Sequence, residues 1–486
     1  MSAQAQNVTR ITVDADEVVR LARDLIAIES HSEAPGREAP IGRFLVDWFH
    51  ARGIEAELVP AIGDRANVIA RVPAGGRAAC SLGDTPHSHP ALGEAKPGRT
   101  LLLNGHIDTV PAGAMKDAFT PRIEDGVLWG RGACDMKGAV AAMACVLAAT
   151  ARGEAALRQP DAMCCVLAAV ARSGPAANPR RESSGVKVPG SKLGVEGRSA
   201  DRLGRSCAPL VGSLLFVGTV DEETGSLGVK RLVESGLKAD YAIVGEPTNL
   251  RVAVAHKGAC FIRITLSGRG AHGSCPEKGV SAVSYGARIV TALEDELRPL
   301  LAQRTYPLLG ASTISVGRLC GGTEPNIVAE RCEIDVDRRT LPGDSVAEGG
   351  SASGPDSVGT DSVGRDTVGE VRRIVAAICD GVVGLSYQVY ETERTSTVPH
   401  VALGTSPDAP LSRAAIAACL DAGLPADPVG VTYWTDGAHL AANGLETVIL
   451  GPGDIANAHG PNDQVKVDDL IKVAQVYLWV VRNLLT

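Results

Sequence analysis

The sequence predicts an α/β fold: a mostly parallel sheet with helices on its faces, interrupted by an inserted unit with its own sheet. Strand and helix signals alternate from about residue 100 to about residue 250, as in βαβ units. From Gly258 the order becomes strand, helix, strand, strand, helix, strand, which is the ferredoxin-like succession β-α-β-β-α-β. After about Thr395 the first pattern returns. We therefore expect a first domain part at 1–256, an inserted domain at 257–395 and a second part at 396–486.

The first part opens with two helices and continues with strands. Apolar residues recur at helical spacing from Ala15 to Ile28 and from Ile41 to Ala51. The elements expected next are the strands GIEAELVP, ANVIARVP and TLLLNGH, a helix after Asp135, the strand SLLFVGTV, a helix from Gly228 to Ser235 and the strand YAIVGEP. Because side chains at the carboxyl ends of parallel strands line one crevice, we expect the chemistry there.

The inserted and final parts follow the same reasoning. The expected elements are ACFIRITLSG, a helix at Gly279–Leu297, STISVGRL, RCEIDVDRRT, a helix at Val368–Ile378, LSYQVYETE, a helix at Leu411–Ala422, TVILGPG and a last helix at Asp468–Leu485. Three stretches rich in turn formers, at about 77–98, 172–210 and 345–369, are interpreted as loop additions. The last contains DSVGTDSVGRDTVGE, a near-repeat that indicates tract expansion rather than a packed element.

Composition narrows the functional classes. With 486 residues the chain is too long for one compact core, and 45% hydrophobic with 21% charged residues is ordinary for a globular protein. A net charge of −8 without a basic block argues against nucleic acid as a partner. The N-terminus has no apolar signal region and no stretch gives eighteen uninterrupted apolar residues, so we expect no membrane association and a cytoplasmic location. Twelve cysteines without a CxxC pair indicate reduced thiols.

Acidic residues and histidines follow the apolar runs. In LLLNGHIDTVP, His106 and Asp108 are two apart, so on an extended segment they point the same way. His106 is then a candidate metal ligand through one ring nitrogen while Asp108 accepts a hydrogen bond from the other. The plainer alternative is a buried histidine at a strand end, with an aspartate that opens a turn.

Four further residues follow the same pattern. Asp135 in GRGACDMKG precedes a helical run, so it is a candidate helix N-cap, a candidate bridge between two cations, or both. Glu222 and Glu223 in VDEETGS are adjacent, which suits one metal ligand and one general base, or else a solvated acidic turn that caps the next helix. Glu246 follows the strand YAIVG, where a lone carboxylate is costly unless it is paired or binds metal.

His459 in NAHGPND lies in a loop, and by itself it is as compatible with a surface histidine as with a ligand. Each of these signals is weak alone, and the specificity lies in their number and order. Taken together, GHIDTVP, GRGACDMKG, VDEETGS, VGEPT, AHKG, GRGAHGS and AHGPND resemble the M20 metallopeptidase family, in particular its acetylornithine deacetylase and succinyl-diaminopimelate desuccinylase branch. The resemblance covers almost the whole chain apart from the three additions.

The resemblance implies a zinc-peptidase-like catalytic domain with a dinuclear centre. One divalent ion would be bound by His106, Asp135 and Glu246 and the other by Asp135, Glu223 and His459, with Asp135 bridging. The resemblance further implies that Asp108 orients His106 and that Glu222 is the general base. Zinc is the family's usual ion and cobalt often substitutes, which agrees with a set of nitrogen and oxygen ligands.

The resemblance also assigns roles within the inserted domain, which serves in the family as a lid and dimerisation domain. It implies a homodimer in which His272 of GAHGS stabilises the oxyanion in the partner's site, with help from Asn326. Arg339 in DRRTLPG would bind a substrate carboxylate as a bidentate fork, although a surface arginine on a lid strand is the alternative. The sequence departs from the family at Ala329, where proline is common, and at Asp463, where glutamate is common.

The expected function is a dinuclear zinc amidohydrolase that removes the acyl group of a small N-acyl amino acid. We favour a hydrolase of C–N bonds outside peptides over a peptidase. The alternatives are a dipeptidase or carboxypeptidase with the same centre, and a non-catalytic binding protein that keeps the fold.

Overall fold

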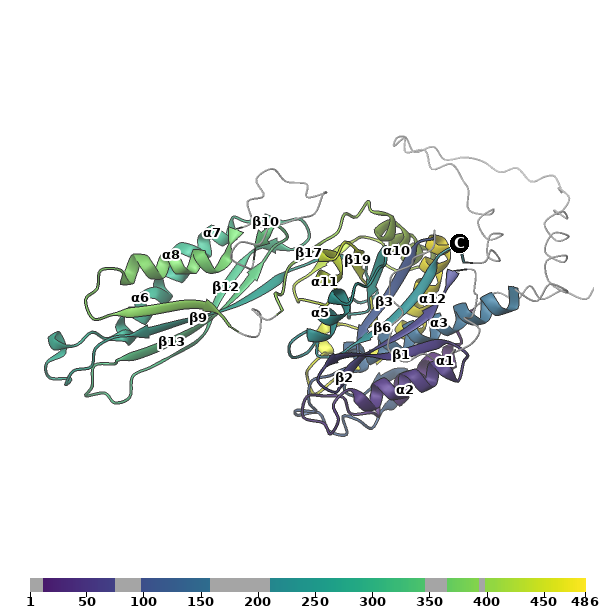
Figure 1. Cartoon of the computed structure of the whole chain (residues 1–486), viewed down its shortest axis with the longest axis horizontal. Coiled ribbons are helices and arrows are strands. Elements are labelled where there is room, and N and C mark those ends of the chain that lie inside the picture. Colours follow the sequence, from purple (N-terminus) through teal and green to yellow (C-terminus); the bar gives the residue numbers. More distant parts are fainter. Residues whose placement is uncertain (1–11, 75–97, 158–209, 346–364, 393–397) are drawn as a thin grey trace, which may run out of the picture.

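The computed structural model describes residues 12–74, 98–157, 210–345, 365–392 and 398–486. Figure 1 shows two sheets, each with its own helices, at opposite ends of an elongated molecule. The larger sheet is built from chain segments on both sides of the smaller one in sequence. We call the part from Gly258 to Glu391 the inserted unit and the rest the central unit.

The central sheet has a parallel middle with antiparallel strands at both ends. β6, β3, β7 and β19 are neighbours in this order and run parallel, which confirms the predicted α/β class with a mostly parallel centre. β1, β2, β8 and β17 join by antiparallel pairing, and β18 pairs with β8 in parallel. The strands in sheet order are β1 (Glu55–Ile62), β2 (Arg65–Val72), β6 (Ser213–Thr219), β3 (Thr100–His106), β7 (Tyr241–Val244), β19 (Glu446–Ile449), β8 (Ala253–His256) and β17 (Leu403–Gly404), with β18 at Val429–Val431.

Helices cover both faces of this sheet. The larger core forms beneath α1 (Ala15–Ile26), α2 (Ala39–His50), α3 (Gly138–Leu157), α10 (Pro410–Asp421) and α12 (Val467–Leu485). The opposite face is covered by α5 (Leu227–Glu234) and α11 (Gly437–Ala442). The helical stretch Ala133–Gly153 is long and apolar enough to cross a membrane by length and composition, but its most apolar window is entirely buried in the fold. A helix that is apolar all round is what a central core helix requires.

The inserted unit follows the expected β-α-β-β-α-β succession. Its antiparallel sheet has the order β12-β13-β9-β16, and its buried core is separate from those of the central unit. Its main elements are β9 (Gly258–Ser267), α6 (Ala282–Ala292), β12 (Thr313–Gly321), β13 (Arg331–Thr340), α8 (Thr367–Cys379) and β16 (Ser386–Glu391). The smaller elements are a π-helical turn (Leu293–Leu297), α7 (Arg298–Ala302), β10 (Thr305–Tyr306), β11 (Gly310–Ala311), β14 (Asp344–Ser345) and β15 (Arg365–Asp366).

A third, small sheet joins two distant parts of the central unit. It contains β4 (Arg122–Glu124), β5 (Val127–Trp129) and β20 (Gln464–Lys466) in the order β20-β5-β4. The pairing of β20 with β5 brings the segment that follows His459 against the segment that precedes Asp135.

The interpretation of the third addition was wrong at its carboxyl end. Residues 75–97, 158–209 and 346–364 lie outside the described part of the chain, and with them most of the three proposed additions. Arg365–Glu370, however, belongs to the near-repeat and forms β15 and the first turn of α8. Asp366 caps this helix by accepting a hydrogen bond from the Gly369 amide, and Glu370 is buried against Arg304 and Arg338. The helix cap and the buried ion pair hold residues 365–370 in the fold, and the amino-acid composition of this stretch does not reveal these contacts.

Candidate metal centre

The carboxyl ends of three neighbouring parallel strands carry the first group of candidate residues. His106 is the last residue of β3 and lies in register with Thr219, the last residue of β6. The Asp221–Glu223 turn follows β6, and Glu246 lies two residues beyond β7. Because parallel strands end at the same edge, residues that are 140 positions apart meet there.

Close packing of α3 against the sheet requires glycine beside two of these residues. A Cβ atom on Gly105 would lie 2.7 Å from Cε of Met136 and 2.9 Å from Cγ2 of Val140. A Cβ atom on Gly245 would lie 2.7 Å from the same methionine carbon. The glycines therefore let Met136, the neighbour of Asp135, reach the strand ends that carry His106 and Glu246.

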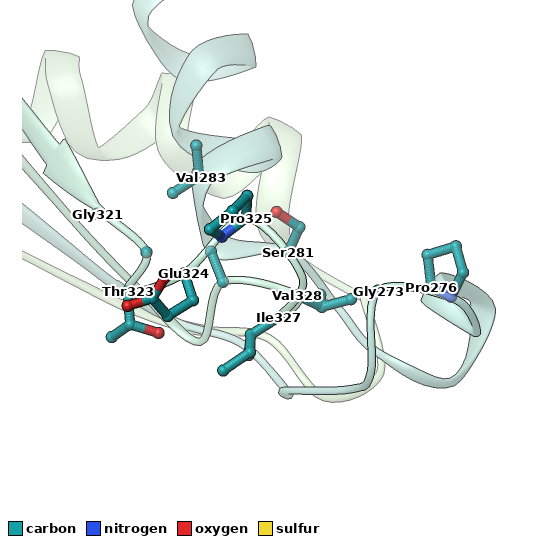
Figure 2. A pocket seen from close by; sticks show the side chains of 12 residues that line it. Gly273, Pro276, Ser281, Val283, Gly321, Thr323, Glu324, Pro325, Ile327 and Val328 are labelled. Carbon is teal, nitrogen blue, oxygen red and sulfur yellow. The ribbon is translucent and has the colours of Figure 1, made fainter.

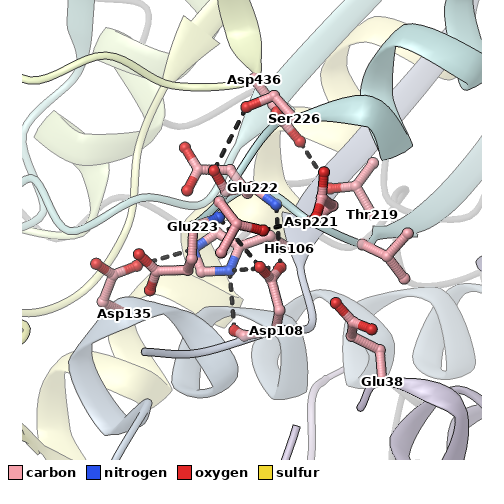
Figure 3. A network of polar contacts seen from close by, with 12 residues as sticks. Glu38, His106, Asp108, Asp135, Thr219, Asp221, Glu222, Glu223, Ser226 and Asp436 are labelled. Carbon is pink, nitrogen blue, oxygen red and sulfur yellow. Dashed lines mark hydrogen bonds and ion pairs between the residues drawn. The ribbon is translucent and has the colours of Figure 1, made fainter. Parts of the chain in front are cut away.

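Asp135 lies between two imidazoles (Figure 3 shows it with His106). Its Oδ1 is 2.8 Å from Nε2 of His106, and its Oδ2 is 3.2 Å from Nε2 of His459. Asp135 has extended backbone angles and α3 begins three residues later, at Gly138. The expected N-cap role is therefore wrong, because the carboxylate faces the histidines rather than the helix start.

The glutamates complete the cluster. Oε1 of Glu246 is 3.7 Å from Nε2 of His106, and Oε2 of Glu223 is 2.9 Å from Nε2 of His459. Ligand atoms of two sets lie within 4.8 Å of one another: His106 with Asp135 and Glu223, and His106 with Glu222 and Glu246. All the predicted ligands and Glu222 thus meet in one place, with the side chain of His459 the most exposed, at 53%.

Asp108 contacts both His106 and the two glutamates. Nδ1 of His106 donates a hydrogen bond to the main-chain oxygen of Asp108 at 3.1 Å, while the Asp108 carboxylate is 3.5 Å from that nitrogen. The carboxylate accepts hydrogen bonds from the amides of Glu222 (3.3 Å) and Glu223 (3.0 Å). Asp108 therefore orients the imidazole partly through its backbone, and its side chain holds the turn that carries both glutamates.

Burial and mutual repulsion shift the pKa values in the cluster. Burial, followed by the neighbouring carboxylates, raises the pKa of Glu222 and of Glu246 well above the ordinary value. Burial and then Asp135 raise the pKa of Glu223. Burial opposes the charge on His106, but Glu246, Asp108 and Asp135 outweigh it and hold its pKa well above the usual range. The three glutamates thus lack sufficient positive charge from protein groups, and this is the electrostatic situation that a bound cation relieves.

The donor set fits divalent zinc or cobalt. The cluster contains two imidazoles and four carboxylates, and neutral imidazole and carboxylate are ligands that both ions accept. A carboxylate with each oxygen directed at a different histidine suits a bridge between two ions. The geometry therefore allows hydrolytic chemistry that depends on an activated water.

A buried ion-pair network supports the Glu222–Glu223 turn, and the sequence analysis did not identify it. Arg65 on β2 donates to Glu38 at 2.7 Å from Nε and to Asp221 at 2.8 Å from Nη1. Asp221 has a positive φ of 72°, and its main-chain oxygen accepts from the amides of residues 224–226. Its carboxylate also accepts a hydrogen bond from the Leu227 amide at the start of α5, whose N-cap residue is Ser226, so within the acidic turn it is Asp221 that contacts this helix end.

Asp436 is a second buried acid that the sequence analysis missed. It is 2% exposed, accepts a hydrogen bond from the Thr219 hydroxyl at 2.8 Å and lies beside the cluster in Figure 3. Burial raises its pKa to about 7 despite that hydrogen bond. In the sequence, Asp436 lies in the motif WTDG and does not follow an apolar strand, so the pattern used for the other acids does not identify it. Only the position of α11 in the fold shows that Asp436 lies next to the cluster.

His272 and Asn326 lie together, but away from the cluster of the same chain. The Gly273 amide donates to the Asn326 main-chain oxygen at 2.7 Å, and Nδ1 of His272 is 2.7 Å from the Ser274 hydroxyl. Both loops border a hollow of about 590 Å³ on the inserted unit, shown in Figure 2. β9 begins at the junction with the central unit, and its ten residues carry the chain roughly 30 Å away before His272 is reached.

Arg339 occupies the opposite, junction-proximal end of the inserted sheet. It pairs with Ala259 at the start of β9, and its side chain is about 32% exposed. Its guanidinium lies 2.9 Å from Asp337 through Nε and 3.1 Å through Nη2. The arginine is thus partly exposed and already oriented by a carboxylate two residues away on the same face.

Comparison with known proteins shows the family of the chain. The model of peptidase family M20/M25/M40 matches residues 102–160 and 200–483. An acetylornithine deacetylase of Myxococcus xanthus is 29% identical over 382 residues, which cover 77% of this chain and 78% of that protein. An acetylornithine deacetylase of Proteus mirabilis is 27% identical over 339 residues, 67% of each chain.

Solved structures show the same fold. The aminopeptidase PepT of Bacillus cereus has a TM-score of 0.64 at 19% identity and covers 97% of this chain and 99% of its own. An M20 family metallo-carboxypeptidase of Sulfolobus solfataricus has a TM-score of 0.59 at 15% identity and covers 96% and 99%. Because the family model matches more than half of this chain, the chain belongs to peptidase family M20/M25/M40 and is a hydrolase of that family.

Proposed function

We propose that the protein is a metal-dependent amidohydrolase that removes the acyl group from a small N-acyl amino acid. The observation that carries the proposal is the placement of Asp135 between His106 and His459, with Glu246 and Glu223 on either side. The deacetylase names of the relatives support the choice of an acylated amino acid over a peptide.

Two divalent ions, zinc or cobalt, are proposed at this place. His106, Asp135 and Glu246 would hold one, and Asp135, Glu223 and His459 the other. Glu222 lies within reach of the first set as well. We assign it to proton transfer because Glu223 already contacts His459, which leaves its neighbour free to face water and substrate.

When bound, the ions would supply Lewis acidity that polarises the scissile carbonyl and acidifies water. Glu222 takes a proton from the attacking water and delivers it to the leaving nitrogen, so that amide and water yield a carboxylate and an amine. Asp108 holds the main chain of Glu222 while this occurs.

The inserted unit is proposed to act as lid and dimerisation domain, spanning 257–395. Arg339 would bind the substrate carboxylate, since it is partly exposed near the junction. His272 and Asn326 are remote from their own cluster, so we propose that they serve the site of a partner subunit in a homodimer. The eight cysteines in the described residues are free, which supports our proposal of a cytoplasmic location.

The test compares Glu222→Gln with the unchanged protein on N-acetylornithine, succinyl-diaminopimelate and dipeptides. Loss of the base is expected to lower kcat by about 10²–10⁴-fold while metal content, measured by mass spectrometry, stays the same. Equal activity in the variant would refute the role of Glu222. Turnover of dipeptides alone would replace the deacetylase proposal with a dipeptidase, and metal binding without any turnover would indicate a binding protein.

A further inference from the structure

A buried arginine lies where three segments of the candidate centre meet. Arg131 is 1% exposed. Its Nε donates to the main-chain oxygen of Pro111 at 3.2 Å, and its Nη2 donates to that of Ala112 at 3.1 Å, just beyond Asp108. Nη2 also donates to the main-chain oxygen of Gly460 at 3.2 Å, next to His459. One guanidinium therefore connects the His106–Asp108 segment with the His459 loop.

Asp463 completes the connection from the other side. It is 1% exposed and lies 332 residues from Arg131 in sequence, with Oδ2 accepting from Nη1 of Arg131 at 3.1 Å. The same oxygen accepts from the Gly132 amide at 2.7 Å, and Oδ1 accepts from the Cys134 amide at 2.9 Å. The Gly130 amide donates to the Asp463 main-chain oxygen at 3.1 Å. The Asp463 carboxylate thus binds the backbone of the turn that leads to Asp135.

We infer that Arg131 and Asp463 are positioning residues that hold the His459 loop against the Asp135 turn, and thereby set the affinity of the ion bound by Asp135, Glu223 and His459. The inference rests on the proposed function. His459 needs such support because its side chain is half exposed and its loop follows a short 3₁₀ turn, whereas His106 ends a buried strand. Partners that orient metal ligands change metal affinity by about 10–100-fold when they are removed.

The fold offers a way to separate positioning from folding. β20 pairs with β5 directly after Asp463, so the two segments stay docked when the carboxylate is altered. Asp463→Asn keeps the size but supplies only one acceptor atom. The asparagine amide can be placed in two orientations. In one, its NH₂ group faces the Cys134 amide, and in the other it faces the Gly132 amide and Arg131, so in both cases two donors oppose each other. Asp463→Glu keeps two acceptor oxygens and the charge, so it should retain more of the contact.

The experiment is a stepwise Co²⁺ titration of the metal-free full-length protein, followed by absorption and calorimetry. His459→Ala identifies the binding step that belongs to the second ion. In Asp463→Asn this step is expected to weaken by about 10–100-fold, and the step of the other ion by less, because His106 and Glu246 are held by their own strands. Asp463→Glu should lie between Asn and the unchanged protein.

Glu370→Gln is the matched control. Glu370 is a buried carboxylate between Arg304 and Arg338 in the inserted unit and is not one of the proposed metal ligands, so Glu370→Gln weakens a comparable buried ion pair outside the ligand set. Co²⁺ affinities in this control should equal those of the unchanged protein. Unaltered affinities in folded Asp463→Asn, or an equal loss in Glu370→Gln, would overturn the inference. Failure of the unchanged protein to bind Co²⁺ would instead overturn the proposed function, and the inference with it.

Discussion

Replacing Arg65 by methionine is expected to destabilise the fold much more than loss of an exposed arginine. Arg65 joins Glu38 and Asp221, and all three side chains are at most 8% exposed. Methionine fills much of the same space but carries no charge, so two buried carboxylates lose their partner. Burial opposes the charge on Arg65, yet the two carboxylates raise its pKa, which shows how strongly they hold it ionised.

The magnitude follows from what the substitution leaves behind. Breaking a buried ion pair by removing one partner costs about 3–5 kcal/mol, because the remaining charge stays buried and unpaired. At about 2 °C per kcal/mol, the value for domains near 250 residues, Tm should fall by roughly 6–10 °C. The turn that carries Glu222 and Glu223 also loses an anchor at Asp221, so metal affinity should decline as well.

The assay is urea unfolding at constant pH and metal content, followed by circular dichroism. Arg231→Met is the matched control, because Arg231 pairs with Glu234 at 2.8 Å but their side chains are 58% and 45% exposed. Its cost should stay below about 0.5 kcal/mol. Arg65→Lys keeps a charge but not the fork, and should lie between the two. The reasoning is refuted if Arg65→Met and Arg231→Met lose similar, small amounts of stability.

Two other predictions concern metal removal and pH. Chelation should lower the free energy of unfolding, and free Zn²⁺ or Co²⁺ at 100 times the Kd should restore about 2.7 kcal/mol per ion. If the urea unfolding curve is the same with and without metal, the proposed centre is contradicted. Burial, then Lys230, lowers the pKa of His439 to about 4, so the folded ring stays neutral while the unfolded ring takes up a proton below about pH 6.5. Its stabilising contribution is complete above pH 6.5 and should fall by about 1–3 kcal/mol as pH drops toward 4. In His439→Phe the loss of stability between pH 7 and pH 5 should be smaller, and an equal loss would assign that pH dependence to other groups.

Strands and helices with strong local periodicity were predictable. TLLLNGH coincides with β3, and the expected final helix differs from α12 by one residue. Short elements such as β8, which has four residues, were not predicted. The ends of helices were also inexact. The helix expected at Gly279–Leu297 begins at Ala282, where Ser281 caps it, and the helical segment continues through α7 to Ala302. Local patterns define the interior of an element well, but capping and tertiary pairing decide where it starts and ends.

The sequence by itself determined which residue types stand at the strand ends, because apolar runs followed by His, Asp or Glu are local features. The local pattern left open whether Asp135 caps α3 or bridges two ions, and only the family resemblance implied the bridge. No sequence feature indicated that Asp463 meets Arg131 from 332 positions away. Those contacts depend on how parallel strands align their ends and on how β20 returns to β5. Pairing between distant segments leaves no periodic trace in the chain, so only the tertiary structure decided which charges neutralise one another.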